Sequence, residues 1–304
     1  MVVVGQASHT QVAGFDDDAV AVFSHQTITG GGNGMITKDP REHWDQQAPI
    51  YASDEGQRRF GRFLELYEEA CWHYIEPALP EVDTSTILEA GCGTGRWVMR
   101  LAPLGYRMVL SDLSPAMIGY AREKVERLEL SDRVTGYYAL DICDMHALPD
   151  ASFDLVLALG GPLTLCRDAG LAAGEFRRVT RPGGYVICDV ANRYRTALDL
   201  VRENQTGQLA RVLDAGQFAR PDGLTDHRFG PRELAALFEA HGMEALHVAG
   251  VCPFFDLLPT AEQVSILDDE HVFETMQDVG GRYAEDPFAV ALSGRLLIVA
   301  RRRE

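Results

Sequence analysis

The stretch Ile87-Leu88-Glu89-Ala90-Gly91-Cys92-Gly93-Thr94-Gly95-Arg96-Trp97 decides the fold of this chain. A short apolar run ends at an acidic residue, three glycines follow at alternate positions, and a helical pattern of apolar residues begins at Trp97. This order predicts a strand, a tight turn and a helix. Because glycine adopts positive φ and carries no Cβ, the turn can hold a nucleoside-like ligand against its main chain.

The spacing of these glycines separates two classes of nucleotide ligand. A dinucleotide site needs Gly-x-Gly-x-x-Gly, and Arg96 stands where its third glycine would be. The stretch instead resembles the first motif of class I S-adenosylmethionine-dependent methyltransferases, E/D-x-G-x-G-x-G, whose fixed positions are matched by Glu89, Gly91, Gly93 and Gly95. The resemblance implies S-adenosylmethionine as cofactor, held by these residues and by Cys92. An ordinary loop between a strand and a helix is the alternative that the turn alone leaves open.

The next apolar run, Tyr106 to Leu110, predicts a second strand that ends at Ser111-Asp112. A carboxylate at such a strand tip can accept hydrogen bonds from both ribose hydroxyls through its two oxygens. The segment Asp112-Leu113-Ser114-Pro115-x-Met117 resembles the second motif of the same family, which implies cofactor contacts for Asp112, Leu113 and Met117. A helix N-cap is the ordinary alternative, and it accounts for Ser114 but not for Asp112.

Two further strand ends complete the predicted cofactor site. The run Arg133 to Ile142 predicts a third strand, and the resemblance implies that Asp141 contacts the adenine amino group and that the Ile142 amide meets the ring. Asp144 is a competing choice for the acidic position. The buried run Ser152 to Leu159 ends at Gly160-Gly161. Because ligands of such sheets lie outside the carboxyl ends of the strands, Leu159 and Gly160 are expected near the reacting methyl group.

The fold class predicted from these elements is α/β. The resemblance implies a Rossmann-like, mostly parallel seven-stranded sheet with an antiparallel last strand and helices on both faces. Its core would comprise residues 81–191, 229–252 and 291–304. Residues 1–39 are expected to form a flexible arm, 40–80 lid helices, and 192–228 and 253–290 insertions that cap the substrate.

An aromatic segment precedes the predicted core. The pattern from Trp44 to Tyr51 resembles the pre-core helix of many small-molecule methyltransferases, which implies that Tyr51 approaches the methionine end of the cofactor. Phe60, Phe63 and Tyr67 recur at helical spacing, so core packing is at least as good an explanation for them.

The composition of the chain limits which binding partners and which cellular compartment we expect. The chain of 304 residues has a formal net charge of -17, which would repel phosphate backbones, so nucleic acid is not an expected partner. No apolar run is long enough to span a bilayer, and Met1 to Val4 lacks a basic leader, so we expect no membrane partner and a cytoplasmic protein. Six widely spaced cysteines predict free thiols and no metal site. The oligomeric state stays open, with a homodimer among the alternatives.

The sequence says least about the methyl acceptor and the catalytic residues. A general base is needed only where the attacking atom must lose a proton, and His227 is the first choice, followed by His146 and His271. For each of them, a surface or packing histidine is the more common explanation, because nothing in the sequence places it beside the methyl group. No Asn-Pro-Pro-Tyr segment follows the fourth strand, which favours a small organic acceptor with oxygen, nitrogen or carbon left open. A non-catalytic S-adenosylmethionine-binding subunit and a nicotinamide-dependent oxidoreductase are the alternatives.

Overall fold

The computed structural model describes residues 39–53, 61–255 and 265–304, and everything below concerns these residues. The predicted N-terminal arm, apart from Asp39, lies outside the described residues, as does Phe60. Among the described helices, none has the length and apolar character needed to cross a bilayer.

Seven strands form one mixed sheet in the order β3-β2-β1-β4-β5-β9-β8. The first five strands pair in parallel, whereas β9 runs antiparallel to both of its neighbours. This topology confirms the predicted Rossmann-like sheet with an antiparallel last strand. The strands are β1 (Thr86–Ala90), β2 (Arg107–Asp112), β3 (Val134–Ala139), β4 (Phe153–Ala158), β5 (Thr180–Ala191), β8 (Met243–Val251) and β9 (Arg295–Arg302).

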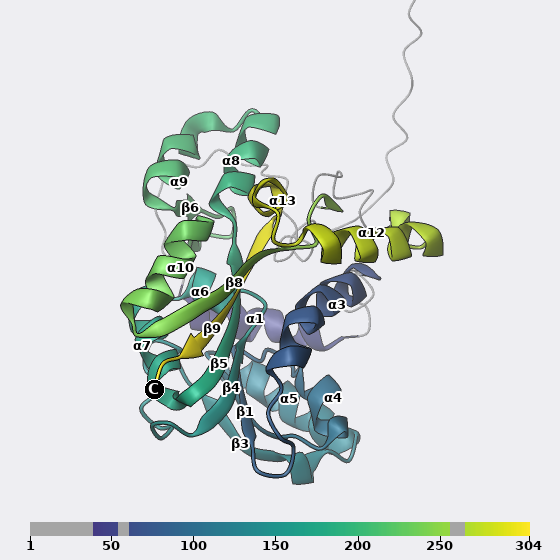
Figure 1. Cartoon of the computed structure of the whole chain (residues 1–304), viewed down its shortest axis with the longest axis vertical. Coiled ribbons are helices and arrows are strands. Elements are labelled where there is room, and N and C mark those ends of the chain that lie inside the picture. The colour runs from purple at the N-terminus through teal and green to yellow at the C-terminus, as the bar shows by residue number, and fades with distance from the viewer. Residues whose placement is uncertain (1–38, 54–60, 256–264) are drawn as a thin grey trace, which may run out of the picture.

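Helices cover both faces of the sheet (Figure 1). Successive strand residues point to opposite faces, so Ile87 joins one hydrophobic cluster and Leu88 the other. On the Ile87 side the cluster includes side chains of α3 (Phe63–Ile75), α4 (Val98–Leu101), α5 (Pro115–Arg127) and α12 (Glu270–Tyr283). The Leu88 side is covered by α6 (Pro162–Leu165), α7 (Ala169–Val179), α10 (Pro231–Ala240) and α13 (Pro287–Leu292).

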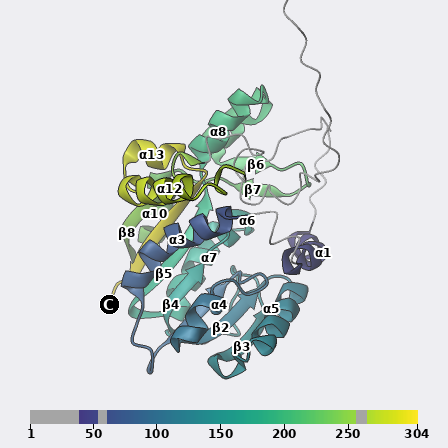
Figure 2. The same cartoon turned by 90° about the vertical axis from the view of Figure 1, so that its right-hand side faces the viewer.

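Helix α1, a small hairpin and two further helices lie toward the carboxyl ends of the parallel strands (Figure 2). Figure 2 shows α1 (Pro40–Ala52) beside α5, with the hairpin of β6 (Gln217–Ala219) and β7 (Thr225–His227) above it. The helices α8 (Arg193–Arg202) and α9 (Leu209–Ala215) extend from the end of β5. Short 3₁₀ turns are η2 (Glu76–Ala78), η3 (Ala102–Leu104), η4 (Ser131–Arg133) and η5 (Thr206–Gln208). The division of the chain into core, lid and cap stays a prediction.

Some predicted boundaries were wrong. The third strand ends at Ala139, so Asp141 lies in the turn beyond it, where it forms an isolated bridge with Asp144. The sequence predicts that Pro182-Gly183-Gly184 stops the preceding helix and that a strand begins at Tyr185, but the strand β5 starts at Thr180 and continues through these residues with an irregular register. Helix α7 has already ended at Val179.

Candidate cofactor and acceptor site

A cavity opens where β1 and β4 end side by side, at the point where the chain crosses from one half of the sheet to the other. Crevices at such switch points are where open α/β sheets bind ligands. Its walls include most of the predicted cofactor residues: Tyr51, Glu89, Gly91, Cys92, Gly93, Asp112, Leu113, Met117, Asp141, Ile142, Leu159 and Gly160. Gly95 is not among the lining residues of this cavity.

The glycine turn brings main chain to the cavity wall. Gly91 has a φ of 75°, and a Cβ there would stand 2.8 Å from Cβ of Pro162, so no larger residue fits. The turn is fixed to the neighbouring strand because the Gly91 and Cys92 amides both donate to the Ser111 carbonyl, at 2.7 and 2.9 Å. A Cβ on Gly93 or on Gly160 would meet no atom within 4 Å. Both glycines therefore border open space and allow a ligand to approach the backbone.

Glu89 secures the helix that follows the turn. Its carboxylate is buried and accepts from the backbone amides of Trp97 and Val98, each at 3.0 Å. Burial raises the pKa of Glu89 to about 7, although these two hydrogen bonds favour the ionised form. Glu89 thus satisfies the first amides of α4 while it lines the cavity.

Asp112 joins the two cofactor motifs. One of its oxygens accepts from the Gly93 amide at 2.8 Å, and the other accepts from the Ser114 amide at 2.9 Å. Burial raises the pKa of Asp112, and the two amides oppose that rise. Each carboxylate oxygen can accept a second hydrogen bond, so the site retains acceptors for two hydroxyl groups.

Asp141, the residue expected to contact the adenine, is itself fixed by hydrogen bonds. Asp141 accepts from the Cys143 amide at 2.8 Å and from Nε of Arg167 at 3.0 Å, and Ile142 lies beside it on the cavity wall. The competing Asp144 does not line the cavity. It receives instead a contact of 2.9 Å from Nδ1 of His146.

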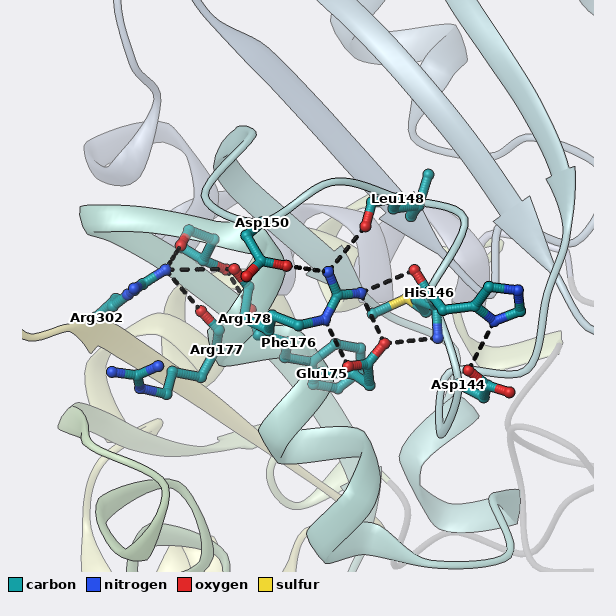
Figure 3. Close-up of polar contacts among 11 residues, drawn as sticks. Asp144, His146, Leu148, Asp150, Glu175, Phe176, Arg177, Arg178 and Arg302 are labelled. Atoms are coloured by element: carbon teal, nitrogen blue, oxygen red, sulfur yellow. Dashed lines mark hydrogen bonds and ion pairs between the residues drawn. The ribbon is translucent and has the colours of Figure 1, made fainter.

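Arg178 anchors the loop that follows (Figure 3). Its guanidinium donates to the carbonyls of Met145 and Leu148, both at 2.8 Å. The Glu175 carboxylate accepts from Arg178 Nε at 2.7 Å and from the Met145 amide at 2.6 Å. This arrangement connects the loop to α7 and leaves the His146 side chain 80% exposed, directed toward Asp144.

Helix α1 forms the wall opposite the glycine turn. Trp44 and Tyr51 line the cavity, and their rings lie edge to face with centroids 5.9 Å apart. Asp45 on the same helix accepts from the Ser114 hydroxyl and, at 3.2 Å, from the Ala116 amide. Asp45 therefore helps to cap the N-terminus of α5 and attaches α1 to the core.

Charged residues act on the Tyr51 hydroxyl at the cavity wall. Burial raises the pKa of the Tyr51 hydroxyl, and the positive charges of Arg220, Arg96 and Arg295 oppose the rise. Of these three, Arg96 lines the cavity.

Asp189, at the end of β5, organises the loop after β4. One of its oxygens accepts from the Gly160 and Gly161 amides at 2.8 and 2.9 Å. The other accepts from the Tyr67 hydroxyl at 3.0 Å and pairs with Arg295. The carboxylate is fully buried, so this network holds Gly160 in its left-handed conformation at the cavity.

The structure does not bring either predicted catalytic histidine to the cavity wall. His227 lies on β7, where Nε2 contacts Glu233 at 2.8 Å. His146 lies on the surface loop of Figure 3. His271 begins α12 and is exposed there. No described residue of the cavity wall is a histidine. None of these three histidines is therefore placed to accept a proton from a molecule bound in the cavity.

Sequence reasoning missed several wall residues, among them Thr94, Arg96, Trp97, Leu165 and Cys166. In the sequence, Arg96 is evidence only against a dinucleotide-binding motif, because it replaces the third glycine of that motif. The direction of its side chain depends on Glu68 of α3, whose carboxylate accepts from Arg96 at 3.1 Å, and that contact is not encoded locally.

These residues fit an adenosyl cofactor. Gly93 and Gly160 leave the main chain accessible at the cavity wall, because a Cβ at either position would meet no atom within 4 Å. The Asp112 carboxylate, which contacts the Gly93 amide, can still accept further hydrogen bonds. The indole N–H of Trp97 is buried at the same wall and has no hydrogen-bond partner in the part of the chain described here. Leu113, Met117 and Leu140 supply an apolar surface next to Asp141.

Comparison with known proteins finds a match for part of the chain. Residues 87–184 match the model described as "Methyltransferase domain". A malonyl-[acyl-carrier protein] O-methyltransferase of Yersinia pestis is 37% identical over 101 residues, which are 33% of this chain and 34% of that protein. This match thus spans about a third of the relative's length.

Two more distant likenesses extend over most of the chain. The tRNA 5-carboxymethoxyuridine methyltransferase of Escherichia coli K12 is 23% identical over 83% of this chain and 91% of that protein. The solved structure of the [4+2]-cyclase SpnF has a TM-score of 0.54 at 20% identity and covers 77% of this chain and 80% of that one, which shows a shared fold. Because one relative is named for tRNA, the exclusion of nucleic acid stays a prediction.

Proposed function

Because the chain belongs to the class I S-adenosylmethionine-dependent methyltransferases, we propose that it transfers the methyl group of S-adenosylmethionine to a carboxylate oxygen of a small organic acceptor. The observation that carries the proposal is the cavity at the ends of β1 and β4, with main chain and Asp112 on one side and α1 on the other. When bound, the cofactor supplies a methyl group on a sulfonium, which is already a strong electrophile.

The residues of this chain bind, align and exclude water. The glycine turn and Asp112 would hold the adenosyl group, and Asp141 with Ile142 would meet its base. Trp44 and Tyr51 would close the other side, so that the acceptor and the methyl group meet out of water. Such alignment alone can lower a barrier by roughly 7 to 11 kcal/mol.

A carboxylate acceptor fits the absence of a histidine among the described wall residues. A carboxylic acid is ionised near neutral pH and attacks without a general base. Arg96 lines the cavity, and its positive charge would attract such an anion. The acceptors named for the two relatives, a malonyl group and carboxymethoxyuridine, both carry a carboxylate.

The test uses the full chain and S-adenosylmethionine with a tritiated methyl group. Malonyl-acyl carrier protein, free dicarboxylic acids and a metabolite extract are the acceptors. Methyl esters release volatile methanol in alkali, whereas N-methyl and C-methyl products do not. Alkali-labile counts support the proposal, and counts that stay with the product in alkali overturn the carboxylate part alone.

Cofactor binding is measured separately by calorimetry with S-adenosylhomocysteine. We expect Asp112→Ala to weaken binding about 100-fold, because two hydrogen bonds to an ionised acceptor are lost. Gly119→Ala is the matched control, since Gly119 lies on an exposed part of α5 where a Cβ meets nothing within 4 Å. Absence of binding to the unchanged protein would defeat the proposal, and tight NADH binding would revive the oxidoreductase.

A further inference from the structure

A second cavity adjoins the cofactor cavity behind the glycine turn. It has a volume of about 350 Å³ and lies between α3, α4 and α5. The two cavities share Thr94 and Arg96 as wall residues. Three of its seven wall residues are cations, namely Arg96, Arg100 and Lys124, and one is an acid, Glu68.

Lys124 is unusual in this chain. Only two of the 28 basic residues are lysines, Lys38 and Lys124, and Lys124 alone lies in the described part. Its ammonium contacts Thr94 Oγ1 at 3.4 Å, and no carboxylate of the described residues pairs with it. Burial lowers the pKa of Lys124, and the neighbouring charge of Arg96 lowers it further.

The two arginines of this cavity are held in place from α3. Arg96 pairs with Glu68 at 3.1 Å, and Arg100 pairs with Glu69 at 2.7 Å and covers the ring of Trp72. Arg96 and Lys124 line the same cavity although the whole chain has a net charge of -17. Like charges inside a cleft repel each other and focus a positive potential that attracts anions.

We propose that Lys124, Arg96 and Thr94 form an oxyanion subsite that binds a carboxylate or phosphate group of a reactant lying in the adjoining cofactor cavity. The ammonium and the guanidinium donate to the anion, and the Thr94 hydroxyl supplies a third donor. The source of the anion is either a second acidic group of the acceptor or the carboxylate of the cofactor's methionine part. Only this assignment to a reactant rests on the proposed function, because anion binding itself can be tested without methyl transfer.

The first experiment watches Lys124 directly. Reductive methylation with ¹³C-formaldehyde keeps the charge of the lysines and gives separate NMR signals, with Lys38→Arg to assign them. We expect inorganic phosphate to move the Lys124 signal along a saturable curve and to raise the pKa of the dimethylamine. A shift no larger than that caused by sodium chloride at equal ionic strength would overturn the subsite.

The second experiment measures the thermal stabilisation that phosphate gives the unmodified protein, which reports binding to the folded state. Lys124→Gln should weaken the apparent phosphate affinity about tenfold, through loss of one charge-assisted hydrogen bond, and Lys124→Arg should restore most of it. Arg122→Gln removes a positive charge from the same helix outside this cavity and should leave the affinity unchanged. Equal losses in the Lys124→Gln and Arg122→Gln proteins would show general charge attraction only and contradict the proposal.

The third experiment identifies the source of the anion. S-adenosylhomocysteine carries the amino acid carboxylate, whereas 5′-methylthioadenosine lacks it. If Lys124→Gln weakens S-adenosylhomocysteine but not 5′-methylthioadenosine, the cofactor supplies the anion. If Lys124→Gln binds both nucleosides as tightly as the unchanged protein does, but binds phosphate more weakly, the acceptor supplies the anion. The subsite stands in either case, and it fails if the phosphate affinity of Lys124→Gln equals that of the unchanged protein.

Discussion

The two sides of the cofactor cavity are built in different ways. On the glycine side the wall consists of main chain and short segments that follow β1, β2 and β3 directly. On the side of Tyr51 and Gly160, charged residues on distant segments contribute: Arg220 and Arg295 act on the Tyr51 hydroxyl, and Asp189 holds the Gly160 amide and pairs with Arg295. The first side depends on local backbone geometry, and the second depends on ion pairs that only the complete fold assembles.

The largest expected effect breaks the buried ion pair. Arg295→Met leaves the fully buried Asp189 carboxylate without its cation and should lower the free energy of unfolding by about 3 to 5 kcal/mol. Asp189→Asn in the same chain should recover much of the loss, because one oxygen still accepts from Gly160 and Gly161. Urea denaturation measures both. Arg282→Met, which removes a pair with both side chains more than 60% exposed, should cost less than about 1 kcal/mol. If Arg295→Met and Arg282→Met lowered the free energy of unfolding equally, burial would not make the Arg295 pair more important than an exposed one.

A smaller effect concerns pH and the glycine side. Glu89 has a pKa of about 7 when folded, against about 4.3 in an unfolded chain, so the folded state holds its proton more tightly. Its contribution to stability is therefore full below pH 4.3 and is lost as the pH rises through 7. The stability of the unchanged protein minus that of Glu89→Gln should fall by about 2.5 kcal/mol between pH 5 and 8. Denaturation at several pH values checks this, and a flat difference would contradict the assigned burial.

The smallest predicted effect tests how α1 is attached. Asp45→Ala removes the acceptor shared by the Ser114 hydroxyl and the Ala116 amide and should cost about 1 kcal/mol of stability. S-adenosylhomocysteine should also dissociate a few times faster, which stopped-flow fluorescence of Trp44 and Trp97 can follow. Glu42→Ala is the matched control, because Glu42 is an exposed acid on the same helix. If both variants behave alike, α1 is held by its apolar contacts instead.

The sheet topology was predictable through the resemblance of the glycine turn and the strand ends to a known family, because local residues alone do not set the order of strands. The positions of Gly91 and Asp112 were predictable from the residues themselves, since Gly91 directly follows β1 and Asp112 ends β2. The strand boundaries around Asp141 and Thr180 were less predictable, because pairing with neighbouring strands decides where each strand ends. The histidines failed to reach the cavity wall for a related reason: Glu233 and Asp144, which are their partners, lie outside it.

The sequence by itself determined the glycine turn and the acidic residue at the tip of β2, because these features follow from backbone conformation over a few residues. The tertiary structure alone decided which side chains gather around Tyr51 and around Lys124. Those side chains come from segments up to about 240 residues apart in the chain, as Tyr51 and Arg295 do. Their charges become neighbours only when helices pack on the sheet, and no local pattern in the sequence records that packing.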